Sequence, residues 1–308
     1  MLKFLCSLKM KDFFDYIDCP VCLQNNYKIL IKSKYKKNIS KKELLKIFSS
    51  SSEIFLDQLV KCNNCNFIYL NPRINNIIIE KGYSFSEDKK FVSQNEMRIN
   101  TFKGILNQIG KNILLKDKLI LDVGSGGGAF LKACLDLGLK SRGIEPNEWL
   151  VNYARKNYQV DIKNNKFLRI RKKYDIITFF DVLEHVTELN LYIEKINSLL
   201  KKNGYLIINV PDHDSLARKI LNKYWPFYLS VHLYYFTDES LKKLFGKKYK
   251  LVNKKSYWQK LKMGYIADRA SKYFKVFKLI KKLLIFFNLD NKAINYNMGQ
   301  SLFIFKKR

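Results

Sequence analysis

Three groups of side chains in this sequence have residue types and spacings that could support chemistry. Four cysteines form two pairs, Cys19 with Cys22 in CPVC and Cys62 with Cys65 in CNNC. The glycine-rich stretch LDVGSGGG follows one apolar run, and FFDVLEHV closes another with two carboxylates and a histidine. Because polar side chains are costly to bury, an apolar strand that ends in such residues usually ends at a site.

The two cysteine pairs supply four thiolates, the ligand set of a closed tetrahedral zinc site. The stretch between the pairs is longer than is usual for such sites. Reduced unpaired thiols and redox use remain as alternatives to a structural zinc. The position after the second cysteine of such a pair often needs a positive φ, which suits Asn66 and does not suit Leu23. The remaining cysteines, Cys6 and Cys134, are expected to be packing residues.

The glycine-rich turn lies between a predicted strand and a predicted helix that begins near Ala129. Gly124, Gly126 and Gly128 let the backbone approach a ligand and free N–H groups at the helix start. The next predicted strand ends at Glu145, about twenty residues on, where a carboxylate can accept from both ribose hydroxyls. The order of strand, turn, helix and acid predicts a nucleoside-cofactor site. A turn used only for packing would leave Glu145 unexplained.

The carboxylates and the histidine of FFDVLEHV are Asp181, Glu184 and His185. They share one face if a helix begins at Asp181. A second histidine, His232, lies in SVHLYYFTDESL, and the third, His213, is expected to be a loop residue. Three roles stay open: a structural clamp, a neutral histidine acting as general base, and a divalent metal site. We favour His232 as base with His185 as its positioned neighbour.

The elements that position these groups alternate between strand and helix. Strands are predicted over 119–123, 141–145, 174–179 and 205–210, with helices between them. This alternation predicts an α/β fold, a Rossmann-like doubly wound and mostly parallel sheet. The closing QSLFIFKK is expected to be an antiparallel last strand. We predict a small zinc-ribbon-like module over 1–80 and a second domain over 95–308, with a basic helical insertion at about 261–295.

The sequence DVGSGGG, together with the late antiparallel strand, makes the chain resemble the class I S-adenosylmethionine-dependent methyltransferases, whose cofactor motif is DxGxGxG. The resemblance implies that Glu145 holds the ribose and that FFDVLEHV closes the fourth strand, beside cofactor and substrate. One departure is that only Asn164 or Asn165 stands where the family often has an acid for the adenine amino group. The cofactor residues that the resemblance implies are Asp122, Gly124, Ser125, Gly126, Gly128, Glu145 and Asp181.

The stretch CPVC…CNNCNFIYLNPR resembles the small zinc-binding module that precedes a subset of these enzymes. Many members of that subset act on sugars in surface-polysaccharide or sugar-nucleotide pathways. The expected function is therefore methylation of a sugar or a sugar-linked metabolite, as a small molecule or a lipid-linked acceptor, with S-adenosylmethionine and a structural zinc.

Two alternatives to sugar methylation remain. The acid-x-x-Glu-His pattern at Asp181, Glu184 and His185, with the later His232, is similar to that of ubiquinone-pathway and small-RNA O-methyltransferases. In those enzymes it binds a metal that orients vicinal hydroxyls, which implies a metal-assisted O-methyltransferase acting on a quinone-type phenol or RNA. The alternative from another class is a zinc-ribbon nucleic-acid-binding protein with a vestigial cofactor fold.

The net charge of +30 comes from 57 basic and 27 acidic residues. Because lysines are scattered over every segment, this charge indicates a solvated surface, and nucleic acid is not the favoured partner. No secretory signal and no membrane-spanning apolar run is evident. The protein is therefore expected to be cytoplasmic. Its oligomeric state is left open.

One basic segment has a regular pattern. In SKYFKVFKLIKKLLIFF, lysines recur at helical spacing and apolar residues fill the remaining surface, which is typical of a basic amphipathic helix. We expect its apolar residues to pack on the domain. The alternative is a peripheral contact with an anionic membrane, at its inner face and near a lipid-linked acceptor.

Overall fold

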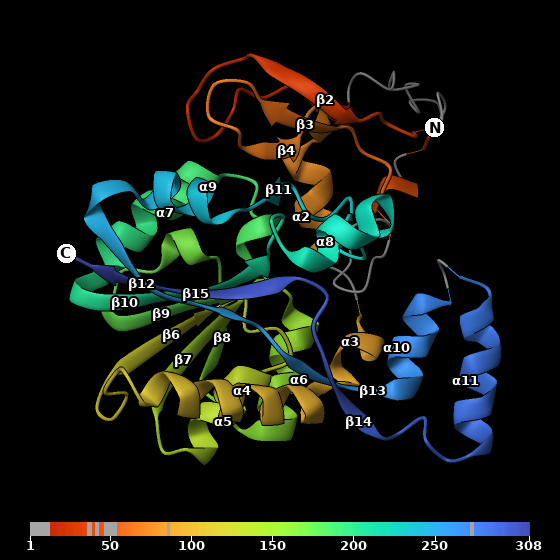
Figure 1. Ribbon diagram of the computed structural model, residues 1–308. Coiled ribbons are helices and arrows are strands. Elements are labelled where there is room, and N and C mark those ends of the chain that lie inside the picture. The colour runs from red at the N-terminus through yellow and green to blue at the C-terminus, as the bar shows by residue number, and fades with distance from the viewer. Residues whose placement is uncertain (1–12, 36–38, 41–42, 46–53, 85–86, 272–273) are drawn as a thin grey trace, which may run out of the picture.

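The computed structural model describes residues 13–35, 39–40, 43–45, 54–84, 87–271 and 274–308. Figure 1 shows a central sheet with helices above and below it, a smaller sheet at the top, and a pair of helices at the right. Within the described part of the chain, no helix has both the length and the apolar character that crossing a bilayer requires.

The central sheet has seven strands in the order β12-β15-β10-β9-β6-β7-β8. Strands β8, β7, β6, β9 and β10 run parallel, and β15 is antiparallel to both of its neighbours. This confirms the doubly wound, mostly parallel sheet with an antiparallel last strand. The bounds are β6 (Leu119–Val123), β7 (Lys140–Glu145), β8 (Ile162–Asn164), β9 (Tyr174–Phe180), β10 (Leu200–Pro211), β12 (Tyr249–Ser256) and β15 (Gln300–Lys307).

Strand β8 is absent from the sequence prediction. It has only three residues, of which Ile162 alone is buried. It therefore lacks an apolar run like those of β6, β9 and β10.

Helices cover both faces of the sheet, so successive strand residues face different cores. In β6, Ile120 packs with α4, α5 and α6, whereas Leu121 packs on the other side with α7 and α9. Burial on both faces explains why β6, β9 and the second half of β10 read as largely apolar runs. The helices are α4 (Asn95–Gly110), α5 (Ala129–Asp136), α6 (Glu148–Tyr158), α7 (Leu189–Leu199) and α9 (Asp238–Phe245).

The smaller sheet combines three strands from the N-terminal part of the chain with one strand from its C-terminal half. Its order is β11-β4-β3-β2, all antiparallel, with β2 (Tyr27–Ile31), β3 (Leu59–Cys62) and β4 (Ile68–Leu70) from the N-terminal part. Strand β11 (Tyr234–Tyr235) directly follows the segment that carries His232. The N-terminal sheet therefore holds that segment in place. The division into domains at about residues 80 to 95 stays a prediction.

Short elements connect the two sheets. The strands β1 (Phe14–Asp15) and β5 (Arg73–Ile74) pair with each other. Helix α2 (Asn76–Ser84) and the one-turn helix α3 (Lys89–Val92) then lead to α4.

A helical excursion lies between β12 and β15. It begins and ends with an antiparallel pair, β13 (Gln259–Lys262) and β14 (Ala293–Tyr296). Between these strands are α10 (Met263–Ala270) and α11 (Val276–Phe286), which lie side by side at the right of Figure 1.

Candidate functional site

The four paired cysteines come together in space. Their sulfur atoms lie within 4.8 Å of one another, with 3.4 Å between Cys19 Sγ and Cys65 Sγ and 3.5 Å between Cys22 Sγ and Cys62 Sγ. A tetrahedral zinc with Zn–S bonds of about 2.3 Å needs sulfurs roughly 3.8 Å apart. The donor set and its spacing therefore fit a closed zinc site.

The two CxxC turns have the same backbone geometry. Leu23 N donates to Cys19 O at 2.8 Å, and Asn66 N donates to Cys62 O at 3.0 Å. Both Leu23 and Asn66 have positive φ, 59° and 65°. Leu23 thus adopts a conformation that does not suit a leucine, because the turn imposes it at a cost of about 1–2 kcal/mol. Cys134 is buried in the core, and Cys6 lies outside the described residues.

The glycine-rich turn connects β6 to α5. Gly124, Gly126 and Gly128 have φ of 67°, 50° and 80°. A Cβ on Gly124 would lie 2.6 Å from Val182 Cγ2, and one on Gly128 would lie 2.7 Å from Ala154 Cβ. Left-handed backbone and close packing together exclude side chains here.

Glu145 lies against this turn, as its place at the end of β7 predicts. Its Oε2 accepts from Gly126 N and its Oε1 from Asn147 N, both at 2.9 Å. The side chain is fully buried, and burial raises its pKa to about 7. The Tyr83 side chain also hydrogen-bonds this carboxylate, which opposes the rise of its pKa. The ribose contact of Glu145 stays a prediction.

Asp122 is buried at the end of β6. Its Oδ1 accepts from Thr178 Oγ1 at 2.7 Å, which ties β6 to β9, and burial raises its pKa to about 7. Ser125 Oγ donates to the carbonyl of Asp122 at 3.0 Å. These bonds stiffen the strand end from which the turn departs.

Three residues that the sequence analysis did not single out surround the turn. The Phe91 ring of α3 lies 3.0 Å from where a Cβ of Gly126 would be, and Arg98 stacks on that ring with 3.7 Å between Cζ and the centroid. Asn95 Nδ2 donates to Gly127 O at 2.9 Å. These residues belong to no recognisable sequence motif. Only the packing of α3 and α4 against the turn identifies them.

Two histidines and one carboxylate meet at the end of β9. The candidate ligand atoms of Glu184, His185 and His232 lie within 4.8 Å of one another. Glu184 and His185 lie on the short 3₁₀ helix η3 (Leu183–His185), and His232 comes from the segment before β11.

Both imidazoles are held by backbone carbonyls. His185 Nδ1 lies 2.7 Å from Val231 O, and His232 Nδ1 lies 2.8 Å from Phe227 O. Because a carbonyl only accepts, each Nδ1 carries the proton and each Nε2 keeps a lone pair. Burial lowers the pKa of His185 to about 4 and holds that of His232 well below its ordinary value. Both rings are therefore neutral at pH 7.

Glu184 is the unusual member of this cluster. Its side chain is buried, and neither carboxylate oxygen has a hydrogen-bond partner in the described structure. Burial, followed by the nearby charge of Asp181, raises the pKa of Glu184. Buried polar groups are nearly always paired. An unpaired carboxylate beside two histidines, with both rings oriented through Nδ1, is a donor set that could hold a divalent metal.

Asp181 does not belong to this cluster, so the expected shared helix face is wrong. Strand β9 ends at Phe180, Asp181 has a φ of 55°, and η3 begins only at Leu183. The left-handed residue turns the chain before the helix starts. Asp181 Oδ1 accepts instead from Asn209 Nδ2, at 2.8 Å, and from Gln300 Nε2. It keeps solvent-accessible surface, yet the surrounding protein raises its pKa to about 6.

His213 and the aromatic residues near His232 belong to the core. His213 Nε2 lies 3.1 Å from Tyr228 OH, so this histidine pairs away from the other two. The aromatic side chains on either side of His232 in the sequence are all buried: Trp225, Tyr228, Tyr234 and Tyr235.

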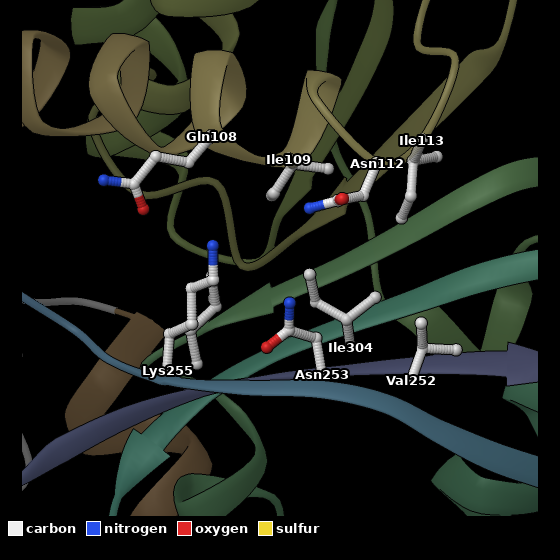
Figure 2. A pocket seen from close by; sticks show the side chains of 9 residues that line it. Gln108, Ile109, Asn112, Ile113, Val252, Asn253, Lys255 and Ile304 are labelled. Carbon is white, nitrogen blue, oxygen red and sulfur yellow. The ribbon is translucent and has the colours of Figure 1, made fainter.

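A separate hollow lies between the end of α4, the edge strand β12 and its neighbour β15. Figure 2 shows Gln108 and Asn112 of this region facing Asn253 and Lys255 across it. None of the residues that line it is a cysteine, histidine, aspartate or glutamate. It thus offers no histidine or carboxylate base and no metal-ligand set. The residues suited to chemistry lie instead in the cysteine cluster, the histidine cluster and the glycine turn.

More than half of the chain matches a known protein family. A family model described as a methyltransferase domain matches residues 95–253. The ubiquinone biosynthesis O-methyltransferase of Pelagibacter ubique is 33% identical over 101 residues, which are 30% of this chain and 42% of that protein. The protein of the same name from Coxiella burnetii is 30% identical over 112 residues, 34% and 48% of the two chains. The chain thus spans less than half the length of the curated relatives it matches.

Solved structures are also similar. A S-adenosylmethionine-dependent methyltransferase from Archaeoglobus fulgidus has a TM-score of 0.48 and 19% identity, covering 71% of this chain and 100% of that one. The magnesium protoporphyrin IX methyltransferase of Synechocystis has a TM-score of 0.47 and 14% identity, covering 77% and 89%.

Proposed function

The chain belongs to the class I S-adenosylmethionine-dependent methyltransferases, and we propose that it transfers a methyl group from S-adenosylmethionine to a hydroxyl oxygen of its acceptor with the help of a divalent metal. The observation that carries this proposal is the buried, unpaired carboxylate of Glu184, which has candidate ligand atoms of His185 and His232 within 4.8 Å of it.

The cofactor would be held by the turn between β6 and α5 and by Glu145. The N–H groups at the start of α5 and the glycine backbone offer close approach, and the Glu145 carboxylate is held beside them by Gly126 N and Asn147 N. S-adenosylmethionine supplies an electrophilic methyl group on a sulfonium. The protein then has to align the acceptor, exclude water and manage one proton.

The metal would be held by Glu184, His185 and His232. A divalent cation there would lower the pKa of a bound acceptor hydroxyl and orient a neighbouring one. The carbonyls of Val231 and Phe227 fix both rings, so that their Nε2 lone pairs remain available. His232 acting alone as general base stays compatible with its neutral state, but that role leaves the buried Glu184 carboxylate unexplained.

The acceptor we propose is a phenol with adjacent hydroxyl groups. The similar proteins from Pelagibacter and Coxiella are named as ubiquinone biosynthesis O-methyltransferases. Together with the Glu184 cluster, they favour the phenol alternative over the expected sugar. The sugar expectation depends on the N-terminal module alone. The nucleic-acid-binding alternative requires a vestigial cofactor fold, whereas the glycine turn keeps its geometry and its bond to Glu145.

The structural zinc stays part of the proposal. With zinc bound to Cys19, Cys22, Cys62 and Cys65, strands β3 and β4 would be fixed to the CPVC turn. Strand β4 pairs with β11, and Leu70 N donates to Leu233 O at 3.0 Å. The zinc module would thus support the segment that carries His232.

The test combines a chelator with a catechol acceptor such as 3,4-dihydroxybenzoate and labelled S-adenosylmethionine. We expect methylation to be lost after EDTA and restored by Mg²⁺ or Mn²⁺, with the zinc content measured before and after to show that the cysteine site is intact. Unchanged turnover in chelated protein would exclude the metal. Methylation of a sugar hydroxyl but of no phenol would exclude the acceptor class.

A further inference from the structure

Helix α11 carries an apolar stripe that nothing in the described structure covers. Val276, Leu279, Leu283 and Phe286 follow one another at helical spacing and share one side of the helix. Leu279 is 58% exposed and Phe286 is 77% exposed. Isolated exposed apolar residues are ordinary, but a continuous stripe along a helix marks an interaction surface.

The opposite side of α11 is already used for packing. Phe277, Ile280 and Leu284 are half-buried on that side, and Lys281 Nζ lies 2.6 Å from Asp268 Oδ1 of α10. The packing expected from the sequence accounts for these residues only. The helix is thus anchored to α10 by one apolar stripe and presents a second one outward.

The charge beside the outer stripe has one sign. Lys275, Lys278 and Lys282 form an exposed row next to it, and α11 contains no aspartate or glutamate. An apolar stripe flanked by lysines fits the boundary of an anionic bilayer, where the rings and leucines enter the acyl region and the ammonium groups reach the headgroups. A protein partner of similar apolar character would gain nothing from this row of lysines unless it were also acidic.

A second element extends the same surface. The short helix α8 (Leu216–Leu221) exposes Leu216 by 72% and Ile220 by 71%. Tyr224, which follows α8, lies against Phe274 at the start of the α11 segment, with 5.6 Å between the ring centroids. Figure 1 shows α8 on the side of the molecule that faces the two helices. Through this ring contact the segment after α8 lies against the segment that leads into α11.

We propose that the surface formed by α8 and the outer side of α11 docks on an anionic lipid bilayer. This proposal concerns a lipid surface and does not depend on the acceptor or the metal proposed above.

The docking surface borders the candidate site through α10. Arg269 of α10 lies close enough for its charge to lower the pKa of both Asp181 and His232.

Co-sedimentation with vesicles tests the proposal on the full chain. We expect binding to phosphatidylcholine vesicles that contain phosphatidylglycerol and at least about tenfold weaker binding to phosphatidylcholine alone, because each lysine near the surface contributes to the attraction. A triple change of Lys275, Lys278 and Lys282 to alanine should abolish that preference. Changing Leu279, Leu283 and Phe286 to serine should weaken binding to anionic vesicles.

The matched control removes the same charge elsewhere. Lys247, Lys248 and Lys250 are exposed, and Lys248 O accepts from Arg308 N at the chain end marked C in Figure 1, far from α11. Their triple alanine variant should keep its preference for anionic vesicles. Equal binding of all three variants and the wild type would overturn the proposal. A second outcome would also overturn it: no vesicle binding, together with light scattering that shows a wild-type dimer and a monomeric serine variant. The apolar stripe would then join two copies of the chain.

Discussion

The imidazole rings of His185 and His232 lie 4.8 Å apart, centroid to centroid, and each is held through its Nδ1 by a backbone carbonyl. The carbonyl that holds His185 belongs to Val231, the residue before His232, and Leu233 N in turn donates to Glu184 O at 2.8 Å. The two segments therefore fix each other, and a change in one ring's support moves the other ring.

Substitution of the cluster should separate catalysis from cofactor binding. We expect Glu184→Gln and His232→Ala to lower turnover by about 10²–10⁴-fold. The affinity for S-adenosylmethionine should stay nearly unchanged, because the glycine turn and Glu145 are elsewhere. Steady-state kinetics and calorimetry measure the two quantities. His213→Asn is the matched control, since this histidine pairs with Tyr228 outside the cluster. A cluster variant with full turnover would assign the residues a structural role.

The glycine turn makes a second prediction. In Gly128→Ala the new Cβ would lie 2.7 Å from Ala154 Cβ at a φ of 80°, so the turn must shift. We expect the affinity for S-adenosylmethionine to fall at least about tenfold, since a left-handed alanine alone costs about 1–2 kcal/mol. Gly104→Ala in α4 is the control, because its Cβ would meet nothing within 4 Å. Equal affinities of the two variants would show that the turn does not hold the cofactor.

Zinc binding should stabilise both the N-terminal cysteine module and the segment that carries His232. Elemental analysis of the wild type should find one zinc per chain. In Cys62→Ser we expect the zinc to be lost and hydrogen exchange to rise in β3, in β4 and in the β11 strand that pairs with β4. Cys134→Ala, a buried cysteine away from the cluster, should retain the metal. Zinc-free wild type with slow exchange in β3 and β4 would contradict this prediction.

His213 predicts a pH dependence of stability. Burial lowers its pKa to about 4, below an unfolded value of about 6.5. The contribution of neutral His213 to the free energy of unfolding is therefore complete above about pH 6.5. It is lost as the pH falls towards 4, because the unfolded chain binds the proton more readily. Between about pH 7 and pH 5 the loss is about 2 kcal/mol. Denaturant unfolding of wild type and His213→Gln at both pH values measures it. The variant should lack this part of the acid sensitivity, and identical pH dependence in both proteins would show that His213 does not cause it.

The sequence by itself determined the features that depend on local order. Apolar runs long enough to be buried on both faces predict β6, β9 and β10. The glycines at 124, 126 and 128, followed by Glu145 at the next strand end, predict a site that the hydrogen bond from Gly126 N to Glu145 Oε2 then brings together. These patterns are readable because each residue is constrained by its neighbours in the chain, through periodicity or a required φ.

Only the tertiary structure decided which residues of distant segments meet and which side chains lack a partner. The spacing of Asp181, Glu184 and His185 suggested one helix face, but a left-handed Asp181 directs its carboxylate to Asn209 and Gln300. Burial and pairing are properties of the whole packed chain, so no local pattern reveals that the Glu184 carboxylate is left unpaired beside His185 and His232. The spacing of apolar residues along α11 shows two stripes. Only the packing of α11 on α10 decides which of the two remains exposed.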